Sequence, residues 1–298
     1  MERVNTFNNL YRKSVDPPPD FPYIIDIELT NCCNLSCRMC SRSLMTRDKG
    51  FISEEIFTKI NDECKAKETG IRFIRWGEPF LHNRILDFSK KIKDGGLPLH
   101  ITTNGLLLTE KEISFLTDIE LDSIIFSMQG VTKKEYAYMR NNKEYDSLIE
   151  NIRSFIRIRD NKKKPYIALT STMTERDNFS DIKKFKSFWK NIVDSVSVGV
   201  TDMKQSECII PVTKKYSLCK EPWQKIGIDW DGEVTACCGD YDRYLSIGNV
   251  KDTTINDIWN NNVVLDSIRN LLSEKEYRHL ALCSKCAPAY GSFAERDK

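Results

Sequence analysis

Seven of the 11 cysteines in this chain of 298 residues fall into two groups, and only 3 histidines accompany them. The first group is Cys33, Cys37 and Cys40, with three and then two residues between them. Ligand sets made only of thiolates favour iron–sulfur clusters or structural zinc. Zinc would need a fourth ligand, and the loop offers only the adjacent Cys32. Three thiolates can instead bind three irons of a [4Fe–4S] cluster, which leaves the fourth iron open to a small molecule.

The second group is Cys219, Cys237, Cys283 and Cys286. Four thiolates can bind every iron of a second [4Fe–4S] cluster, which then has no open iron but can carry electrons. The alternative is a zinc ribbon, because a hairpin followed by a Cys-x2-Cys pair also suits structural zinc. Cys64 lies on an apolar helix face, so we expect it to be a buried hydrophobe.

The composition sets the expected compartment and partners. No apolar run approaches the ~18 residues that span a bilayer, and the first residues lack the apolar core of a signal peptide. We therefore expect a cytoplasmic protein, in which cysteines are more often ligands or catalytic groups than disulfides. The 45 basic and 43 acidic residues nearly cancel, so neither nucleic acid nor a membrane is an expected partner.

The elements that position these cysteines follow from the hydrophobic pattern. From residue 21 onward, short β-type runs alternate with amphipathic stretches, a pattern typical of βα units around a parallel sheet. Six strands are expected: Tyr23–Leu29, Ile71–Trp76, Leu97–Thr102, Ser123–Ser127, Tyr166–Thr170 and Ser195–Val200. Helices are expected after Ser53, after the capping signature of Thr109 with Glu112, and over Phe179–Trp189. Periodicity alone fits both an open doubly wound sheet and a partial barrel, and both place chemistry at the carboxyl ends of the strands.

The pattern changes after Val200. Asp231-Gly232 joins the runs 226–230 and 233–237, which predicts a hairpin. Cys238 should then point to the opposite face from Cys237. Helices are expected near residues 255–259 and from the capping signature at Ser273 through residue 280. A polar tail of this size gains stability from a metal centre.

The first cysteine group, placed after a strand, resembles the signature of the radical S-adenosylmethionine (radical SAM) superfamily. Three further motifs stand in the family's order at strand ends. Arg75-Trp76-Gly77-Glu78-Pro79 is similar to its GGEP element, with Trp in place of the first Gly; Thr102-Thr103-Asn104-Gly105 resembles its TNG element; and Ser127-Met128-Gln129-Gly130, followed by Tyr138–Arg140, resembles a segment near the SAM ribose and carboxylate.

The second group resembles the signature of the SPASM and shorter twitch domains, with Gly232 before Cys237 in the hairpin. The larger SPASM form holds two auxiliary clusters and needs more cysteines than this tail supplies. One auxiliary cluster is therefore expected.

These resemblances imply an α/β fold: a partial (β/α)6 TIM-like barrel over residues 21–205, after an N-terminal extension at 1–20 and before a small α+β cluster-binding domain at 206–298. They imply two [4Fe–4S] clusters and SAM as cofactors, and an external electron donor such as flavodoxin or ferredoxin. SAM bound to the open iron would be cleaved to a 5′-deoxyadenosyl radical that abstracts a substrate hydrogen.

The family's SAM contacts can be carried over onto the matching positions. Glu78 corresponds to the acceptor of the SAM ammonium group. Met39 stands where the family usually has an aromatic residue against adenine, and a polarizable thioether can replace that residue. The expected SAM-binding residues are Met39, Gly77, Glu78, Pro79, Asn104, Ser127 and Arg140.

The favoured function is oxidation of a sugar-like or aminocyclitol-like alcohol, with the auxiliary cluster as electron acceptor. Within the same class, the chain could be an epimerase that uses a thiol such as Cys208 as hydrogen donor, or a peptide maturase. The roughly 20 residues before the first strand disfavour the peptide alternative, because they leave no room for a peptide-recognition domain. From another class, the chain could be a zinc-stabilised binding module without catalysis.

Overall fold

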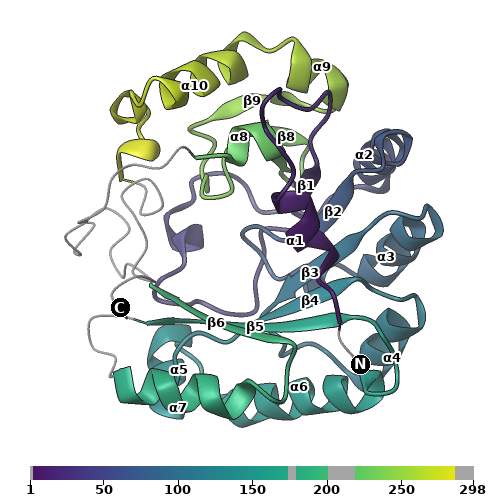
Figure 1. Ribbon diagram of the computed structural model, residues 1–298, viewed down its shortest axis with the longest axis vertical. Coiled ribbons are helices and arrows are strands. Elements are labelled where there is room, and N and C mark those ends of the chain that lie inside the picture. Colours follow the sequence, from purple (N-terminus) through teal and green to yellow (C-terminus); the bar gives the residue numbers. More distant parts are fainter. Residues whose placement is uncertain (1–2, 174–178, 201–218, 286–298) are drawn as a thin grey trace.

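The computed structural model describes residues 3–173, 179–200 and 219–285 (Figure 1). Its strands form one nine-stranded sheet in the order β6-β5-β4-β3-β2-β1-β7-β8-β9. Strands β1 to β6 and β7 run parallel, whereas β8 and β9 are antiparallel to their neighbours. The strands are β1 (Ile24–Ile27), β2 (Gly70–Phe73), β3 (Leu99–Thr103), β4 (Ser123–Ser127), β5 (Tyr166–Met173), β6 (Ser195–Val200), β7 (Lys225–Ile228), β8 (Glu233–Thr235) and β9 (Ser246–Asn249). The six predicted parallel strands and the predicted hairpin are confirmed.

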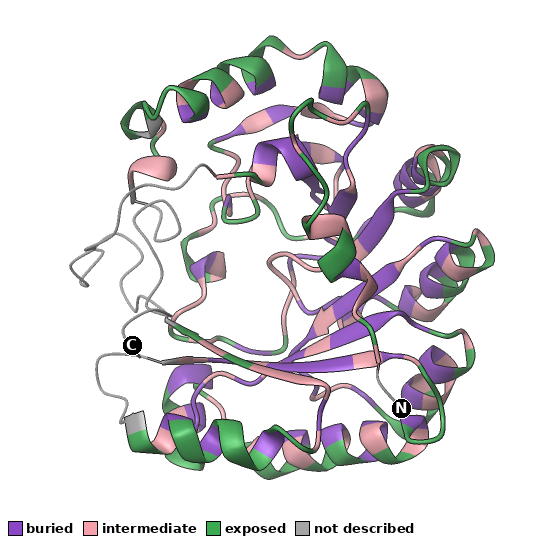
Figure 2. Cartoon of the chain, viewed as in Figure 1, coloured by how far each residue is buried: buried purple, intermediate pink, exposed green. Residues whose placement is uncertain are grey.

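Helices cover the convex side of the curved sheet, with their buried faces toward the strands (Figures 1 and 2). The Ser53 side chain caps the first of them, and Thr109 with Glu112 forms the expected capping box. The arrangement is the predicted partial barrel. Its helices are α2 (Glu54–Lys67), α3 (Ile85–Asp94), α4 (Glu110–Asp118), α5 (Lys133–Arg140), α6 (Tyr145–Arg159) and α7 (Phe179–Trp189). No helix of the described part is long and apolar enough to cross a bilayer.

The C-terminal unit contains α8 (Glu221–Gln224), α9 (Ile255–Asn260) and α10 (Val263–Ser273). The helix predicted from Ser273 was wrong, because Ser273 ends α10 and only a short 3-10 turn follows over Tyr277–His279. The true N-cap is Asn262, whose side chain accepts hydrogen bonds from Val264 N and Leu265 N.

The prediction for Cys238 was also wrong. Strand β8 ends at Thr235, so both cysteines lie in the following turn, where alternation no longer applies. The thiols of Cys237 and Cys238 lie within hydrogen-bonding range of each other.

A charged layer fills the concave side of the sheet near the amino ends of the strands. Asp26 on β1 pairs with Arg72 on β2 through two contacts of 2.6 Å, and Lys225 Nζ lies 3.7 Å from the same carboxylate. The short helix α1 (Thr6–Tyr11) covers this layer, because the Tyr11 ring packs against both cations. Burial would raise the pKa of Asp26, but Arg72 and Lys225 outweigh it and lower the pKa from 3.8 to about 2.

The variant Asp26→Asn should lower the free energy of unfolding of the cluster-free chain by about 3 kcal/mol, because it leaves Arg72 buried without its counter-ion and leaves Lys225 with Glu221 alone. A depressed carboxyl pKa stabilises the fold above its unfolded value of 3.8, and this contribution is lost as the pH falls through about 2. The difference between wild type and variant in urea unfolding should therefore shrink below pH 4. Asp94→Asn removes an exposed pair with Lys90 and should change little. Equal effects of the two variants would contradict the argument.

Candidate active site

The first cysteine group lies on the loop that follows β1. Cys40 N donates to Cys37 O at 3.2 Å, which closes the loop into a turn. Burial raises the pKa of the Cys33 and Cys40 thiols. Backbone amides oppose that effect, since Leu35 N donates to Cys33 Sγ at 3.4 Å and Arg42 N donates to the Cys40 thiol. Such N–H donors stabilise thiolate ligands.

Within the described ranges, no three cysteine, histidine or carboxylate side chains surround the position of a single metal ion. A cubic cluster places each thiolate on a different iron, so its ligands are expected to stand farther apart than those of one zinc ion.

Arg140, the last residue of α5, reaches this loop. Its Nη1 donates to Cys37 Sγ at 3.2 Å, and its Nε donates to Met128 O at 3.3 Å. Its Nη2 is buried and has no hydrogen-bond partner among the described residues. A buried guanidinium nitrogen without an acceptor suits an anionic ligand such as a carboxylate. The side chain thus fits the expected carboxylate group of SAM.

Glu78 follows β2 and is only 2% exposed. Its Oε1 accepts hydrogen bonds from Thr103 Oγ1 at 2.7 Å and Phe80 N at 3.2 Å, and its Oε2 accepts one from Asn104 N at 2.8 Å. Burial raises the pKa of this carboxyl group, and the hydrogen bonds oppose that rise. Oε2 keeps acceptor capacity for a further donor such as an ammonium group.

The remaining predicted SAM contacts lie on neighbouring strand ends. Asn104 Nδ2 donates to Asn34 Oδ1 at 2.8 Å, which brings the end of β3 against the first cysteine loop. Ser127 ends β4, and its Oγ accepts from Gln129 Nε2 at 3.0 Å. Met39 is partly buried in the cysteine loop itself.

Gly77 and Pro79 flank Glu78. A Cβ atom on Gly77 would lie 1.9 Å from Thr30 O and 2.7 Å from Cys32 O, so only glycine fits there. Glu78 N donates to Cys32 O at 2.9 Å, and Pro79 is buried at the start of a 3-10 turn. The motif therefore packs directly on the backbone next to the first cysteine group.

Three members of the second group are described. Cys219, Cys237 and Cys283 are partly buried and pack against the hydrophobic core, and Gly239 N donates to Cys237 Sγ at 3.3 Å. Cys286 and the proposed hydrogen donor Cys208 lie outside the described residues. Cys64 is fully buried, as predicted.

A group of buried charges was missed by sequence reasoning. Arg47 donates to both carboxylate oxygens of Glu28 at 2.6 Å, and Asp229 ion-pairs with Arg75 at 2.9 Å and Arg243 at 2.9 Å. The two residues of a pair stand between 14 and 154 positions apart, so no pattern within one helix or strand could pair them. The one nearby signal in the sequence was Trp76, which stands in place of the first glycine of the GGEP element.

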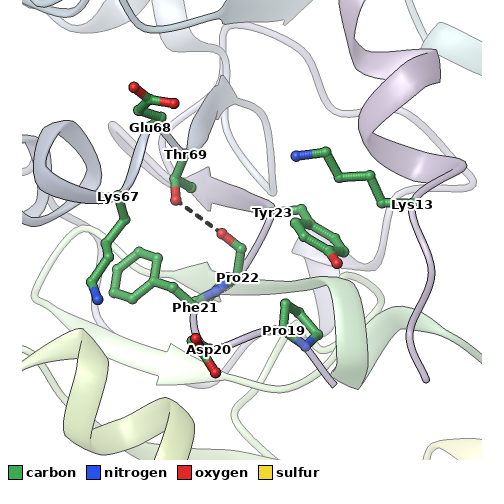
Figure 3. Close-up of a pocket in the computed structure, with 9 residues that line it drawn as sticks. All are labelled: Lys13, Pro19, Asp20, Phe21, Pro22, Tyr23, Lys67, Glu68 and Thr69. Atoms are coloured by element: carbon green, nitrogen blue, oxygen red, sulfur yellow. Dashed lines mark hydrogen bonds between the residues drawn. The ribbon is translucent and has the colours of Figure 1, made fainter. Parts of the chain in front are cut away.

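A pocket of about 250 Å³ lies away from these groups (Figure 3). Tyr23 and Thr69, which line it, directly precede β1 and β2, so it opens at the amino ends of the strands. The cysteine loop and Glu78 are at the carboxyl ends. This pocket is therefore not part of the candidate active site.

Comparison with known families agrees with the geometry. The model of the radical SAM superfamily matches residues 27–188, and the model of the SPASM iron–sulfur cluster-binding domain matches residues 219–287. The chain belongs to the radical SAM superfamily and carries a SPASM domain. It is an enzyme that uses SAM and a [4Fe–4S] cluster, with an auxiliary iron–sulfur cluster in the SPASM domain. The zinc-module alternative is thereby set aside.

Similar proteins cover most of the chain. The tungsten-containing aldehyde ferredoxin oxidoreductase cofactor-modifying protein of Pyrococcus furiosus is 25% identical over 78% of this chain and 79% of its own length. The S-adenosyl-L-methionine-dependent 2-deoxy-scyllo-inosamine dehydrogenase of Niallia circulans is 23% identical over 88% of this chain and 92% of its own. The solved structure of BtrN in complex with AdoMet and 2-DOIA has a TM-score of 0.61 at 18% identity and covers 92% of this chain and 97% of that one. This last likeness shows the fold.

The variant Gly77→Ala should disrupt the first cluster, because the added methyl group would push the motif away from Cys32. We expect iron content to fall from ~8 to ~4 atoms per chain, measured with sulfide after anaerobic reconstitution. Gly199→Ala is the matched control, since no described atom lies within 4 Å of its Cβ position. An unchanged iron content in Gly77→Ala would refute the packing argument.

Proposed function

We propose that this enzyme oxidises an alcohol carbon of a small polyhydroxylated substrate, of the sugar or aminocyclitol class, and that the auxiliary cluster accepts an electron. The observation that carries the proposal is direct contact between the loops that hold the two cysteine groups. Thr46 N donates to Asp242 Oδ1 at 2.8 Å, and Arg47 Nε donates to Tyr241 O at 2.9 Å. An electron acceptor beside the SAM site suits an oxidation better than a redox-neutral reaction. The related dehydrogenase of Niallia circulans supports the same substrate class.

We infer that the barrel occupies residues 21–205 and the cluster-binding domain residues 206–298. The proposed ligands of the first cluster are Cys33, Cys37 and Cys40, and those of the auxiliary cluster are Cys219, Cys237, Cys283 and Cys286. When bound, the first cluster and SAM supply the 5′-deoxyadenosyl radical. An external one-electron donor of the flavodoxin or ferredoxin class would reduce the cluster.

The chain's own residues bind and orient SAM in this proposal. Arg140 offers its unpartnered Nη2 to the carboxylate, and Glu78 offers the free capacity of Oε2 to the ammonium group. Gly77 and Pro79 hold Glu78 in place, while Met39, Asn104 and Ser127 contact the adenosine part. The hydrogen bonds of Glu78 to β3 keep the carboxylate fixed without SAM, which lowers the cost of ordering it on binding.

The proposed ligand sets predict the iron content. Wild type purified without oxygen should hold ~8 iron atoms per chain, and the triple variant Cys33→Ala, Cys37→Ala, Cys40→Ala should hold ~4 and form no 5′-deoxyadenosine with dithionite and SAM. Cys64→Ala, a buried thiol outside both groups, is the control and should keep all the iron. Zinc in place of the residual iron would remove the proposed electron acceptor.

The oxidation itself is tested with a panel of aminocyclitols and sugars deuterated at their carbinol carbons. We expect deuterium in 5′-deoxyadenosine and a product that has lost one deuterium and one hydrogen, both measured by mass spectrometry. A product lighter by one mass unit, with solvent hydrogen in place of deuterium at an inverted carbon, would show an epimerase instead. Turnover of peptides alone would replace the proposal with peptide maturation.

A further inference from the structure

The segment Arg75–Glu78 touches the backbones of both cysteine loops. On one side, Gly77 lies against the carbonyl groups of Thr30 and Cys32, and Glu78 N donates to Cys32 O at 2.9 Å. These contacts fix the segment next to Cys33. The distance from the segment to the first cysteine loop therefore has little freedom.

On its other side, the segment binds the turn that follows Cys237. Trp76 Nε1 donates to Asp240 O at 3.0 Å, and Arg75 Nη2 donates to the same carbonyl at 3.2 Å. The Trp76 ring also packs edge-on against Tyr241, with centroids 6.0 Å apart. Asp240 N donates to Cys237 O at 3.3 Å, so the anchored carbonyl belongs to the turn that presents Cys237.

Arg75 adopts a conformation that an ordinary loop residue avoids. Its φ is 137°, in the region that favours glycine, and its side chain is only 1% exposed. The guanidinium group crosses β7 where Gly227 leaves room, since a Cβ there would lie 1.6 Å from Arg75 Nη1. Asp229 and Thr235 Oγ1 hold it, at 2.9 Å and 3.0 Å. Strain of this kind persists only where the surrounding contacts outweigh it.

The turn is held from a second direction as well. Asp242 accepts hydrogen bonds from Thr46 N at 2.8 Å and Thr46 Oγ1 at 2.9 Å, and Arg47 Nε donates to Tyr241 O at 2.9 Å. Thr46 and Arg47 belong to the stretch that follows the first cysteine group. The loop 237–242 is thus held by two segments. Residues 75–78 contact the first cysteine loop, and Thr46 and Arg47 follow that loop in the chain.

We propose that Arg75 and Trp76 are positioning residues that fix the Cys237 turn, and with it the auxiliary cluster, relative to the SAM site. The fixed turn also directs Gly239 N toward Cys237 Sγ at 3.3 Å. Hydrogen bonds to the sulfur atoms of a cluster raise its reduction potential. The contacts of Arg75 and Trp76 therefore set the reduction potential of the auxiliary cluster as well as its position. This inference rests on the proposed function in one respect, namely that Cys237 is a cluster ligand.

The test is Trp76→Phe, which keeps an aromatic ring and removes the indole N–H together with one of the two fused rings. Amides of residues 238–245 should exchange hydrogen about fivefold faster, the factor expected for one lost hydrogen bond. Iron content should stay at the wild-type value, while the midpoint potential of the auxiliary cluster, from an EPR-monitored titration, becomes more negative. Trp259→Phe is the matched control, because its indole donates to Pro19 O at 2.7 Å, in the segment before β1 and in neither of the two segments that hold the Cys237 turn. It should change neither quantity.

The proposal is wrong if, in Trp76→Phe, residues 238–245 exchange hydrogen at the wild-type rate and the auxiliary cluster keeps the wild-type midpoint potential. If that variant fails to fold, Thr46→Val is used instead, because it removes the hydrogen bond from Thr46 Oγ1 to Asp242. It should likewise speed up hydrogen exchange in residues 238–245 and make the potential of the auxiliary cluster more negative. Failure of the proposed function appears separately. If Cys237→Ala leaves the iron content unchanged, the assignment of Cys237 as a cluster ligand is wrong. Hydrogen exchange of residues 238–245 in Trp76→Phe still shows whether Trp76 holds the turn.

Discussion

The contact between the barrel and the SPASM domain depends on the ion pairs of one buried carboxylate, that of Asp229. It is 1% exposed and lies near three guanidinium groups, those of Arg47 at 3.4 Å, Arg75 at 2.9 Å and Arg243 at 2.9 Å. A carboxylate buried at this depth is costly unless cations compensate it, and removing either side leaves an unpaired charge. Because the arginines come from three separate loops, the pairing forces those loops to meet at the end of β7.

The sheet, which continues from the barrel into the SPASM domain, also fixes the two units relative to each other. Strand β7 pairs in parallel with β1 over four residues, Ile24 opposite Lys225 through Ile27 opposite Ile228. The SPASM domain therefore begins as an extension of the barrel sheet and shares its hydrophobic core, which includes Trp223, Ile228 and Trp259. A domain on a flexible linker would let two redox centres vary in separation, whereas a shared sheet and core fix it.

The sequence predicts the parts of the structure that depend on local pattern. Apolar β-type runs marked the six strands β1 to β6. Side-chain caps such as Ser53 and Thr109 marked helix starts correctly, because capping is a contact within a few residues. The same rule failed at Ser273, since the apolar stripe of Leu265, Ile268 and Leu272 had already formed a helix that ends there. Burial of that stripe against the core outweighs a capping signature.

The residues of the candidate site likewise fall into those that a sequence motif predicts and those that depend on long-range contacts. The motif order placed Glu78, Asn104 and Arg140 near the first cysteine loop, because parallel strands bring their carboxyl ends to one edge. The contacts of Arg47 with Tyr241 and of Arg75 with Asp229 could not be predicted, because each joins residues more than 150 positions apart. Local rules and structure disagree most at Trp76, which replaces the first glycine of the GGEP element, and at Arg75, whose φ of 137° favours glycine. A residue that breaks a backbone preference while burying a charge persists only where its contacts outweigh the strain, and here those contacts hold the turn that contains Cys237.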